Sequence, residues 1–73
     1  MPLERTLKSR ALTLMAGKPV IRHGPQFVVL TGKNLETYNE IERLAQAGEG
    51  KQAEALIEEL GKKVFGPEFD PYA

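Results

Sequence analysis

The sequence predicts a small α+β domain, arranged as helix, β-hairpin, helix and helix, whose sheet is completed or covered by dimerisation. Three observations predict this class. Apolar residues recur at helical spacing in three segments, two short β-branched runs flank a Gly-Pro pair, and the chain has only 73 residues. A chain of this length buries only about 60% of its unfolded surface, so association with a second copy is an expected source of stability.

The first segment is expected to form an amphipathic helix over residues 4–16. Its apolar positions recur every three or four residues, at Leu3, Leu7, Ala11 and Leu14. Gly17 suits a C-terminal cap, and Pro19 would block continuation of the helix. The basic side chains of the segment lie off the apolar stripe and are expected to face solvent: Arg5, Lys8 and Arg10.

A β-hairpin is expected next. Val20 and Ile21 begin a first strand, Gly24 and Pro25 mark a turn, and residues 27–31 read as a second strand. The second strand is apolar on both faces, so both faces need cover. A lone hairpin is not stable in water, and dimerisation through the sheet is therefore expected.

Two further helices are expected over residues 35–47 and 51–63, separated by Gly48 and Gly50. Asn34 suits the N-cap of the first of them. The tail from residue 64 carries two prolines and three aromatic residues, so it is expected to run extended. It can fold back on its own domain or present its aromatic side chains to a partner.

Charge divides the chain into two parts. Residues 1–33 carry six basic residues and one acidic residue, a net charge of +5, whereas residues 34–73 carry four basic and nine acidic residues, a net charge of −5. This asymmetry predicts an anionic partner for a basic domain over residues 1–47 and a basic partner for an acidic, partner-binding segment over residues 48–73. The expected partner contacts of the second segment are apolar and aromatic: Leu56, Leu60, Phe65, Phe69 and Tyr72.

Composition argues against several classes of protein. The chain has no cysteine and one histidine, which excludes disulfides and thiolate metal sites and leaves no metal or cofactor to expect. No apolar run approaches the ~20 residues of a membrane span, and no secretory signal is recognisable. A cytoplasmic protein without a membrane role is therefore expected.

The triplet Arg22-His23-Gly24 is similar to the phosphate-handling motif of histidine phosphatases and phosphoglycerate mutases. Those enzymes need a second histidine, further arginines and a much larger doubly wound sheet. Since this chain has a single histidine and little room, no catalytic residue is expected, and the triplet is interpreted as a hairpin tip that exposes basic residues. Phosphotransfer at His23 is the least favoured function.

Residues 17–44 resemble the Phd/YefM family of bacterial antitoxins, most closely in the stretch LETYNEIE at residues 35–42. The resemblance implies a homodimer that binds operator double-stranded DNA through its N-terminal half and wraps a cognate toxin with its C-terminal half. The positions that match the family's DNA contacts are Arg5, Arg10 and Arg22. Lys8 and His23 lie beside them and are included in the expected DNA-binding set. The alternative function is a protein-binding adaptor without DNA binding.

Overall fold

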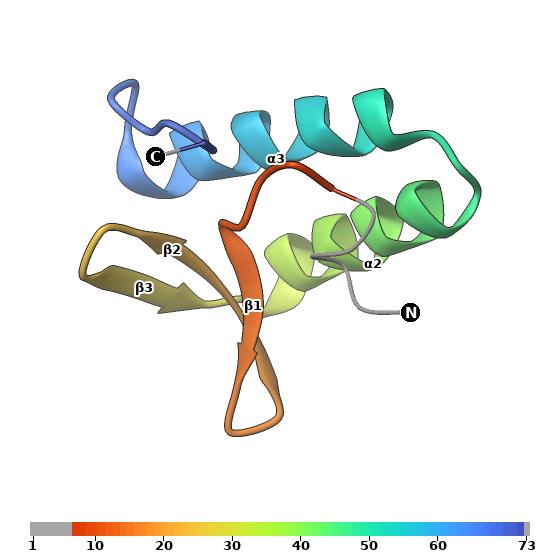
Figure 1. Cartoon of the computed structure of the whole chain (residues 1–73). Helices are drawn as coiled ribbons and strands as arrows, with labels where there is room; N and C mark the ends of the chain where they lie inside the picture. Colours follow the sequence, from red (N-terminus) through yellow and green to blue (C-terminus); the bar gives the residue numbers. More distant parts are fainter. Residues whose placement is uncertain (1–6, 73) are drawn as a thin grey trace.

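The structure, a computed structural model, describes residues 7–72. Among these residues three strands precede two helices, in the order β1 (Leu12–Met15), β2 (Lys18–His23), β3 (Gln26–Val29), α2 (Gly32–Gln46) and α3 (Gly50–Phe65). The strands form one antiparallel sheet with β2 in the middle, and the two helices form a hairpin beside it (Figure 1). The predicted α+β class is therefore confirmed.

The expected N-terminal helix is wrong over the described residues. Residues 7–11 are not helical, and Leu12–Met15 is a strand that pairs with β2. The start of the predicted helix lies outside the described residues. The reason lies at Ala16 and Gly17, whose φ angles of 53° and 77° are both positive. Two consecutive positive φ angles are the requirement of a type I′ hairpin turn, so the chain reverses at Gly17 instead of capping a helix there.

The second hairpin is confirmed. His23 pairs with Gln26, so Gly24 and Pro25 form a two-residue loop between β2 and β3. Gly24 has a φ of 63°, and proline holds its own φ near −65°, which together fit a type II′ turn.

The two C-terminal helices are also confirmed, and each begins earlier than expected. α2 begins at Gly32, with Thr31 in the N-cap position. Asn34, the expected cap, lies inside the first turn, where its Oδ1 atom is buried without a hydrogen bond. α3 runs through Phe65, two residues beyond the expected end, and stops at Gly66, whose φ is 101°. Neither described helix is long and apolar enough to cross a membrane.

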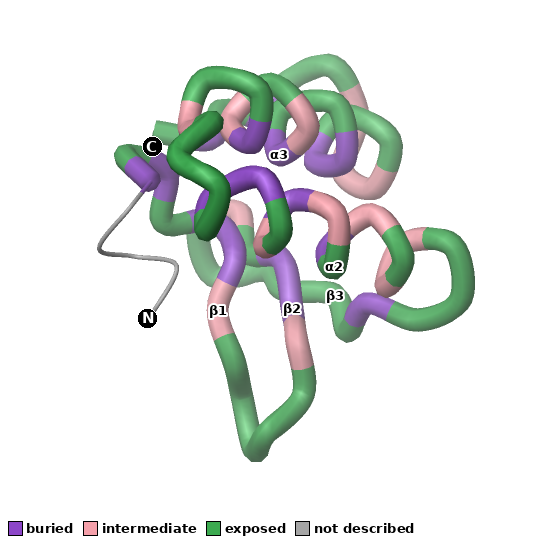
Figure 2. The backbone as a smooth tube through the Cα atoms, turned by 90° about the vertical axis from the view of Figure 1, so that its right-hand side faces the viewer, coloured by how far each residue is buried: buried purple, intermediate pink, exposed green. Residues whose placement is uncertain are grey.

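One hydrophobic core joins the sheet to both helices. Its largest fully buried side chains are Ile21 of β2, Leu30 after β3, Ile41 of α2 and Ile57 of α3. Figure 2 shows buried positions on the facing sides of these elements and exposed positions along the far end of the β1–β2 hairpin. The core therefore draws on both the basic and the acidic halves of the sequence.

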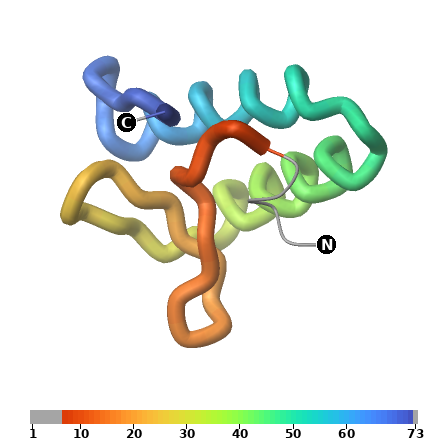
Figure 3. The backbone as a smooth tube through the Cα atoms, in the orientation of Figure 1, coloured from red at the N-terminus to blue at the C-terminus, as the bar shows by residue number. Residues whose placement is uncertain are grey.

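The C-terminal tail folds back onto the domain. Phe69 is buried at 4% exposure, and its ring lies over Gly61 of α3, where no side chain separates them. The hydroxyl of Ser9, also buried, donates a hydrogen bond of 2.7 Å to the carbonyl oxygen of Pro71. Figure 3 shows the end of the tail returning toward the first described residues. The tail thus packs against α3 and against the segment that precedes β1.

Candidate nucleic-acid interface

The described part of the basic half carries charge of one sign. Between residues 7 and 35 there are five basic residues and no carboxylate. All five basic side chains are exposed: Lys8, Arg10, Lys18, Arg22 and Lys33. The two ion pairs among the described residues, Arg43–Glu40 and Lys62–Glu58, both lie within helices. The cations of the sheet and of the segment before it are therefore available to an external anion.

The fold brings three of the predicted DNA-binding residues together. The backbone N–H of Arg22 donates a 2.8 Å hydrogen bond to the carbonyl oxygen of Ala11, which extends the β1–β2 ladder and places Arg10 beside His23. Arg10, Arg22 and His23 line the same cavity of about 100 Å³, at the end of this ladder. Sequence spacing could not indicate this proximity, because it follows from the strand pairing that replaced the expected helix.

His23 is held by aromatic packing. Its ring centroid lies 5.5 Å from that of Phe65 and 5.4 Å from that of Phe69, with both neighbours tilted relative to it. Phe65 and Phe69 are themselves stacked, 5.9 Å apart. No described side chain forms a hydrogen bond with the His23 ring. The imidazole is therefore oriented by the two phenyl rings, and no described residue is positioned to act on it as an acid or base.

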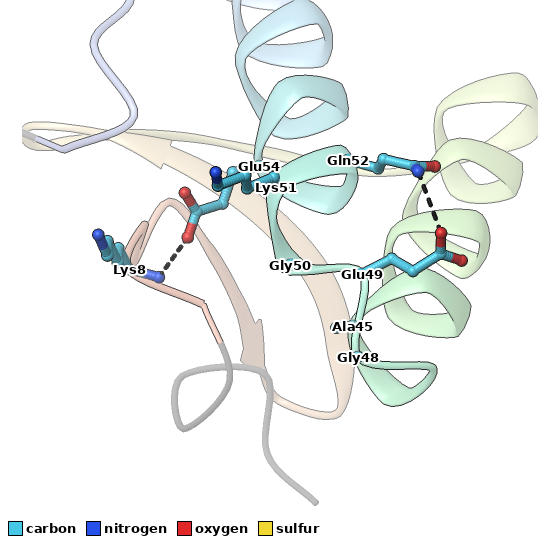
Figure 4. Close-up of a pocket in the computed structure, with 8 residues that line it drawn as sticks. All are labelled: Lys8, Ala45, Gly48, Glu49, Gly50, Lys51, Gln52 and Glu54. Atoms are coloured by element: carbon cyan, nitrogen blue, oxygen red, sulfur yellow. Dashed lines mark hydrogen bonds between the residues drawn. The ribbon is translucent and has the colours of Figure 1, made fainter.

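The remaining predicted DNA-binding residues lie elsewhere. Arg5 is outside the described residues. Lys8 lines a different cavity, of about 710 Å³, beside the start of α3 (Figure 4). Its backbone N–H donates a 2.7 Å hydrogen bond to Oε2 of Glu54. Lys8 therefore belongs to a mixed-charge surface, separate from the arginine pair.

Glu54 links both ends of the described chain. Besides the bond from Lys8, its Oε1 atom accepts a 2.9 Å hydrogen bond from the hydroxyl of Tyr72. The bond from the Lys8 backbone is the main cause that lowers the pKa of the Glu54 carboxyl. Burial opposes this effect, and the Tyr72 hydroxyl adds a smaller lowering. The same contact raises the pKa of Tyr72, because the neutral hydroxyl is the form that donates to the carboxylate.

The predicted partner-binding residues divide into two groups. Leu60 and Phe69 are buried in the core of this chain, and Leu56 and Phe65 are partly buried against it. Tyr72 alone among the five is largely exposed, at 58%. In this conformation, a partner that approaches the tail meets Tyr72 and not the two phenyl rings.

The sheet carries an apolar surface that the predicted site residues did not include. We define this apolar sheet surface by its exposed side chains: Leu14, Met15, Phe27, Val28 and Val29. On one face, Phe27 lies opposite Arg22 and Val29 lies opposite the buried Val20. The sequence had indicated this surface through the second strand of the predicted hairpin, residues 27–31, because its apolar residues need cover on both faces. All four residues of β3 are exposed, so the described chain does not supply that cover to this strand.

The described residues contain no group of three or more histidine, cysteine or acidic side chains arranged to hold a metal ion. Comparisons of the whole chain with protein-family models, curated proteins and solved structures found no significant match.

Proposed function

We propose that the protein is a non-enzymatic DNA-binding dimer that acts as an antitoxin-like transcriptional autoregulator. The observation that carries the proposal is the run from residue 7 to residue 35, with five exposed cations and no carboxylate. Neutralisation of phosphates by such cations supplies most of the affinity of a protein for duplex DNA. Arg10 and Arg22 are the central contacts, because they lie beside one cavity and neither is paired with a described carboxylate.

The shape of the sheet supports the same proposal. The β1–β2 hairpin projects away from the helices (Figure 1), and residues 14–18 at its tip are all exposed. A two-stranded ribbon of this kind is narrow enough to enter the major groove of B-form DNA. Lys18 at the start of β2 and Arg22 near its end would then face the phosphates on either side. Phosphate contacts set affinity and position, whereas base readout would come from the ribbon.

Dimerisation is proposed through β3, which is an edge strand. Residues 26–31 contain neither a charge nor a proline, the features that usually protect a sheet edge from pairing. Antiparallel pairing of β3 with its copy about a two-fold axis places no like charges opposite each other. It would also bring the exposed Phe27, Val28 and Val29 of the two copies together. A six-stranded sheet would result, with one basic hairpin on each side.

The toxin-binding part of the proposal is supported by charge. The outer surfaces of α2 and α3 and the turns on either side of α3 carry exposed carboxylates, at Glu36, Glu49, Glu58, Glu59 and Glu68. A basic partner would meet this surface on the side of the molecule that carries the helices. Tyr72 adds an exposed aromatic side chain beside α3.

The test is a DNA titration by fluorescence anisotropy, with duplex from the protein's own promoter, at two salt concentrations. Removing one phosphate contact reduces the slope of log affinity against log salt by about 0.9. We expect Arg10→Ala and Arg22→Ala each to weaken binding and to reduce the slope. Lys51→Ala is the matched control, because it removes one exposed positive charge from α3. Equal effects in all three variants, or no salt-sensitive binding by the unaltered protein, would overturn the proposal.

Dimerisation is tested by sedimentation of Val29→Lys. Val29 is 42% exposed on the edge strand, so the substitution should leave the monomer fold intact while placing like charges at the proposed interface. We expect a dimer of the unaltered protein and a monomer of the variant. Because lysine adds positive charge, any loss of DNA affinity would come from loss of the dimer. If the unaltered protein is itself a monomer, the proposed dimerisation is wrong.

The adaptor function remains the second candidate, and the apolar sheet surface is the observation that favours it. Large exposed apolar patches often mark protein-binding surfaces. An adaptor predicts no salt-sensitive DNA binding by the protein and predicts that the Phe27→Ala variant loses its protein partner. The DNA titration therefore decides between the two functions.

A further inference from the structure

The register of the sheet sorts its side chains onto two faces. Residues directly opposite each other in an antiparallel pair share a face, and so do alternate residues along one strand. Leu12 and Ile21 are one such pair, and both are buried in the core that includes the helices. The pairs one position along face the other way, and we call their side the outer sheet face. Its members are Thr13, Met15, Lys18, Val20, Arg22, Phe27 and Val29.

Phe27 presents an aromatic ring on the outer sheet face. It is 51% exposed, whereas Phe69 is buried and Phe65 is partly buried against the core. Val29 and Met15, on the same face, are also exposed. Large exposed apolar groups that lie together often mark a binding surface. The outer sheet face therefore offers a flat aromatic group, with apolar neighbours, to an external ligand.

Two cations share the outer sheet face with this ring. Arg22 lies directly opposite Phe27, which places their Cβ atoms about 5 Å apart. Lys18 lies four residues from Arg22 on the same strand, roughly 13 Å along it, with the buried Val20 between them. Both cations are exposed, and neither belongs to the two ion pairs among the described residues. No strand of the sheet carries a carboxylate, so the charge of the face is positive.

The charge and the ring together decide which ligand fits the outer sheet face. A second copy packed face to face would bring Lys18 and Arg22 against like charges, which disfavours self-association through this face. A duplex keeps its bases stacked in its interior, out of reach of a ring on a sheet. An unpaired strand satisfies both features, because its bases stack on aromatic side chains and its phosphates bind cations.

We propose that the outer sheet face binds single-stranded nucleic acid, with a base stacked on Phe27 and phosphates held by Arg22 and Lys18. Stacking on one ring tolerates any base, so the binding is expected to show little sequence preference. The inference goes beyond the proposed function, because it requires unpaired bases and needs neither a duplex nor a second copy of the chain.

The experiment is a fluorescence anisotropy titration of the whole protein into a labelled oligothymidine of about 12 nucleotides, a length within the site sizes of single-strand-binding domains. We expect saturable binding that weakens as salt rises. Each phosphate contact to a single strand contributes about 0.7 to the slope of log affinity against log salt. Arg22→Ala and Lys18→Ala should therefore each lower the slope by about 0.7. Lys51→Ala on α3 is the control and should leave it unchanged.

Substitution of Phe27 separates stacking from charge. Phe27→Leu keeps an apolar side chain at this exposed position and removes the ring, so we expect affinity to fall about tenfold or more. The salt slope should stay the same, because no phosphate contact is lost. Phe27→Tyr keeps a ring and should bind as the unaltered protein does. Circular dichroism checks that every variant keeps its fold.

Absence of saturable single-strand binding, or equal weakening by Phe27→Leu and Phe27→Tyr, would overturn the inference. Binding to phosphatidylserine vesicles without binding to the oligonucleotide would also overturn it, and would assign the face to a lipid surface. Promoter duplex in the same assay tests the proposed function separately. Single-strand binding without duplex binding refutes the proposed function and leaves this inference standing, and duplex binding alone does the reverse.

Discussion

The contact between Gly61 and Phe69 gives the sharpest prediction about the fold. Gly61 lies in the middle of α3, where alanine is normally favoured over glycine by about 1 kcal/mol. A methyl group built at this position would lie 2.1 Å from the nearest ring carbon of Phe69. That separation is far below van der Waals contact, so Gly61→Ala must displace the ring. Helix propensity therefore predicts that Gly61→Ala stabilises the protein, whereas tertiary packing predicts that it destabilises it.

The expected loss of stability follows from the contribution of the buried Phe69 ring to the free energy of folding. Phe69 is 4% exposed, and full burial of a phenylalanine side chain stabilises a fold by up to about 3 kcal/mol. Displacement also strains the hydrogen bond from Ser9 to Pro71, which is worth about 1 kcal/mol. After the gain in helix propensity is subtracted, we expect a net destabilisation of about 2–3 kcal/mol. In a domain of this size that corresponds to a fall in Tm of roughly 10 °C or more.

A double-mutant cycle is the assay. Urea unfolding is followed by circular dichroism for the unaltered protein, Gly61→Ala, Phe69→Ala and the double variant, with an osmolyte present to keep all four folded. In the Phe69→Ala background the clash is gone, so Gly61→Ala should stabilise the protein by about 1 kcal/mol. A change of sign between the two backgrounds is the expected result. The same sign in both would refute the packing of Phe69 on Gly61.

Three further results are expected from smaller changes. Ser9→Ala should destabilise the protein by about 1–3 kcal/mol in urea unfolding, because the buried carbonyl of Pro71 loses its donor. Ala16→Asn should raise stability by about 0.5 kcal/mol in the same assay, because Asn-Gly is a preferred pair in a type I′ turn. In an NMR titration, Tyr72 should ionise above its ordinary pKa of about 10, and Glu54→Gln should lower that pKa. Because the contact raises the pKa of Tyr72 in the folded state, it stabilises the fold while Tyr72 is protonated. This stabilisation is complete below pH ~10 and is lost as the pH rises through the raised pKa of Tyr72.

The elements that local sequence determines were predictable. The β2–β3 hairpin carries its turn in Gly24-Pro25, and α2 and α3 carry regular apolar stripes, so each was expected in the place where it occurs. The structure of residues 12–17 was not predictable, because their pattern fits both a helix and a β-hairpin. Leu14 falls on a helical stripe and also alternates with Thr13 as in a strand, and a positive φ at Gly17 serves either a helix cap or a hairpin turn. Pairing with β2 decided the outcome, and that pairing is a tertiary effect.

The candidate site was predictable by residue type and not by arrangement. Exposure of Arg10 and Arg22 follows from charge alone. Their proximity depends on the β1–β2 register, and the enclosure of the cavity depends on a tail that returns from the far end of the chain. The burial of Phe69 depends on the absence of a side chain at Gly61, a relation between two positions that neither position reveals by itself.

The hydrogen bond from Ser9 to Pro71 joins residues 62 positions apart, and this separation affects the order in which the chain can fold during synthesis. The three strands and α2 can pair and pack soon after they leave the ribosome, which adds about 5–20 residues per second. The contacts of Phe69, Pro71 and Tyr72 must wait for the last part to emerge. Until then Gly61 and the imidazole of His23 lack the cover that the Phe69 ring provides. A nascent chain should therefore acquire its sheet before its cavity, and chains stalled before residue 69 should expose the apolar surface that the tail later covers.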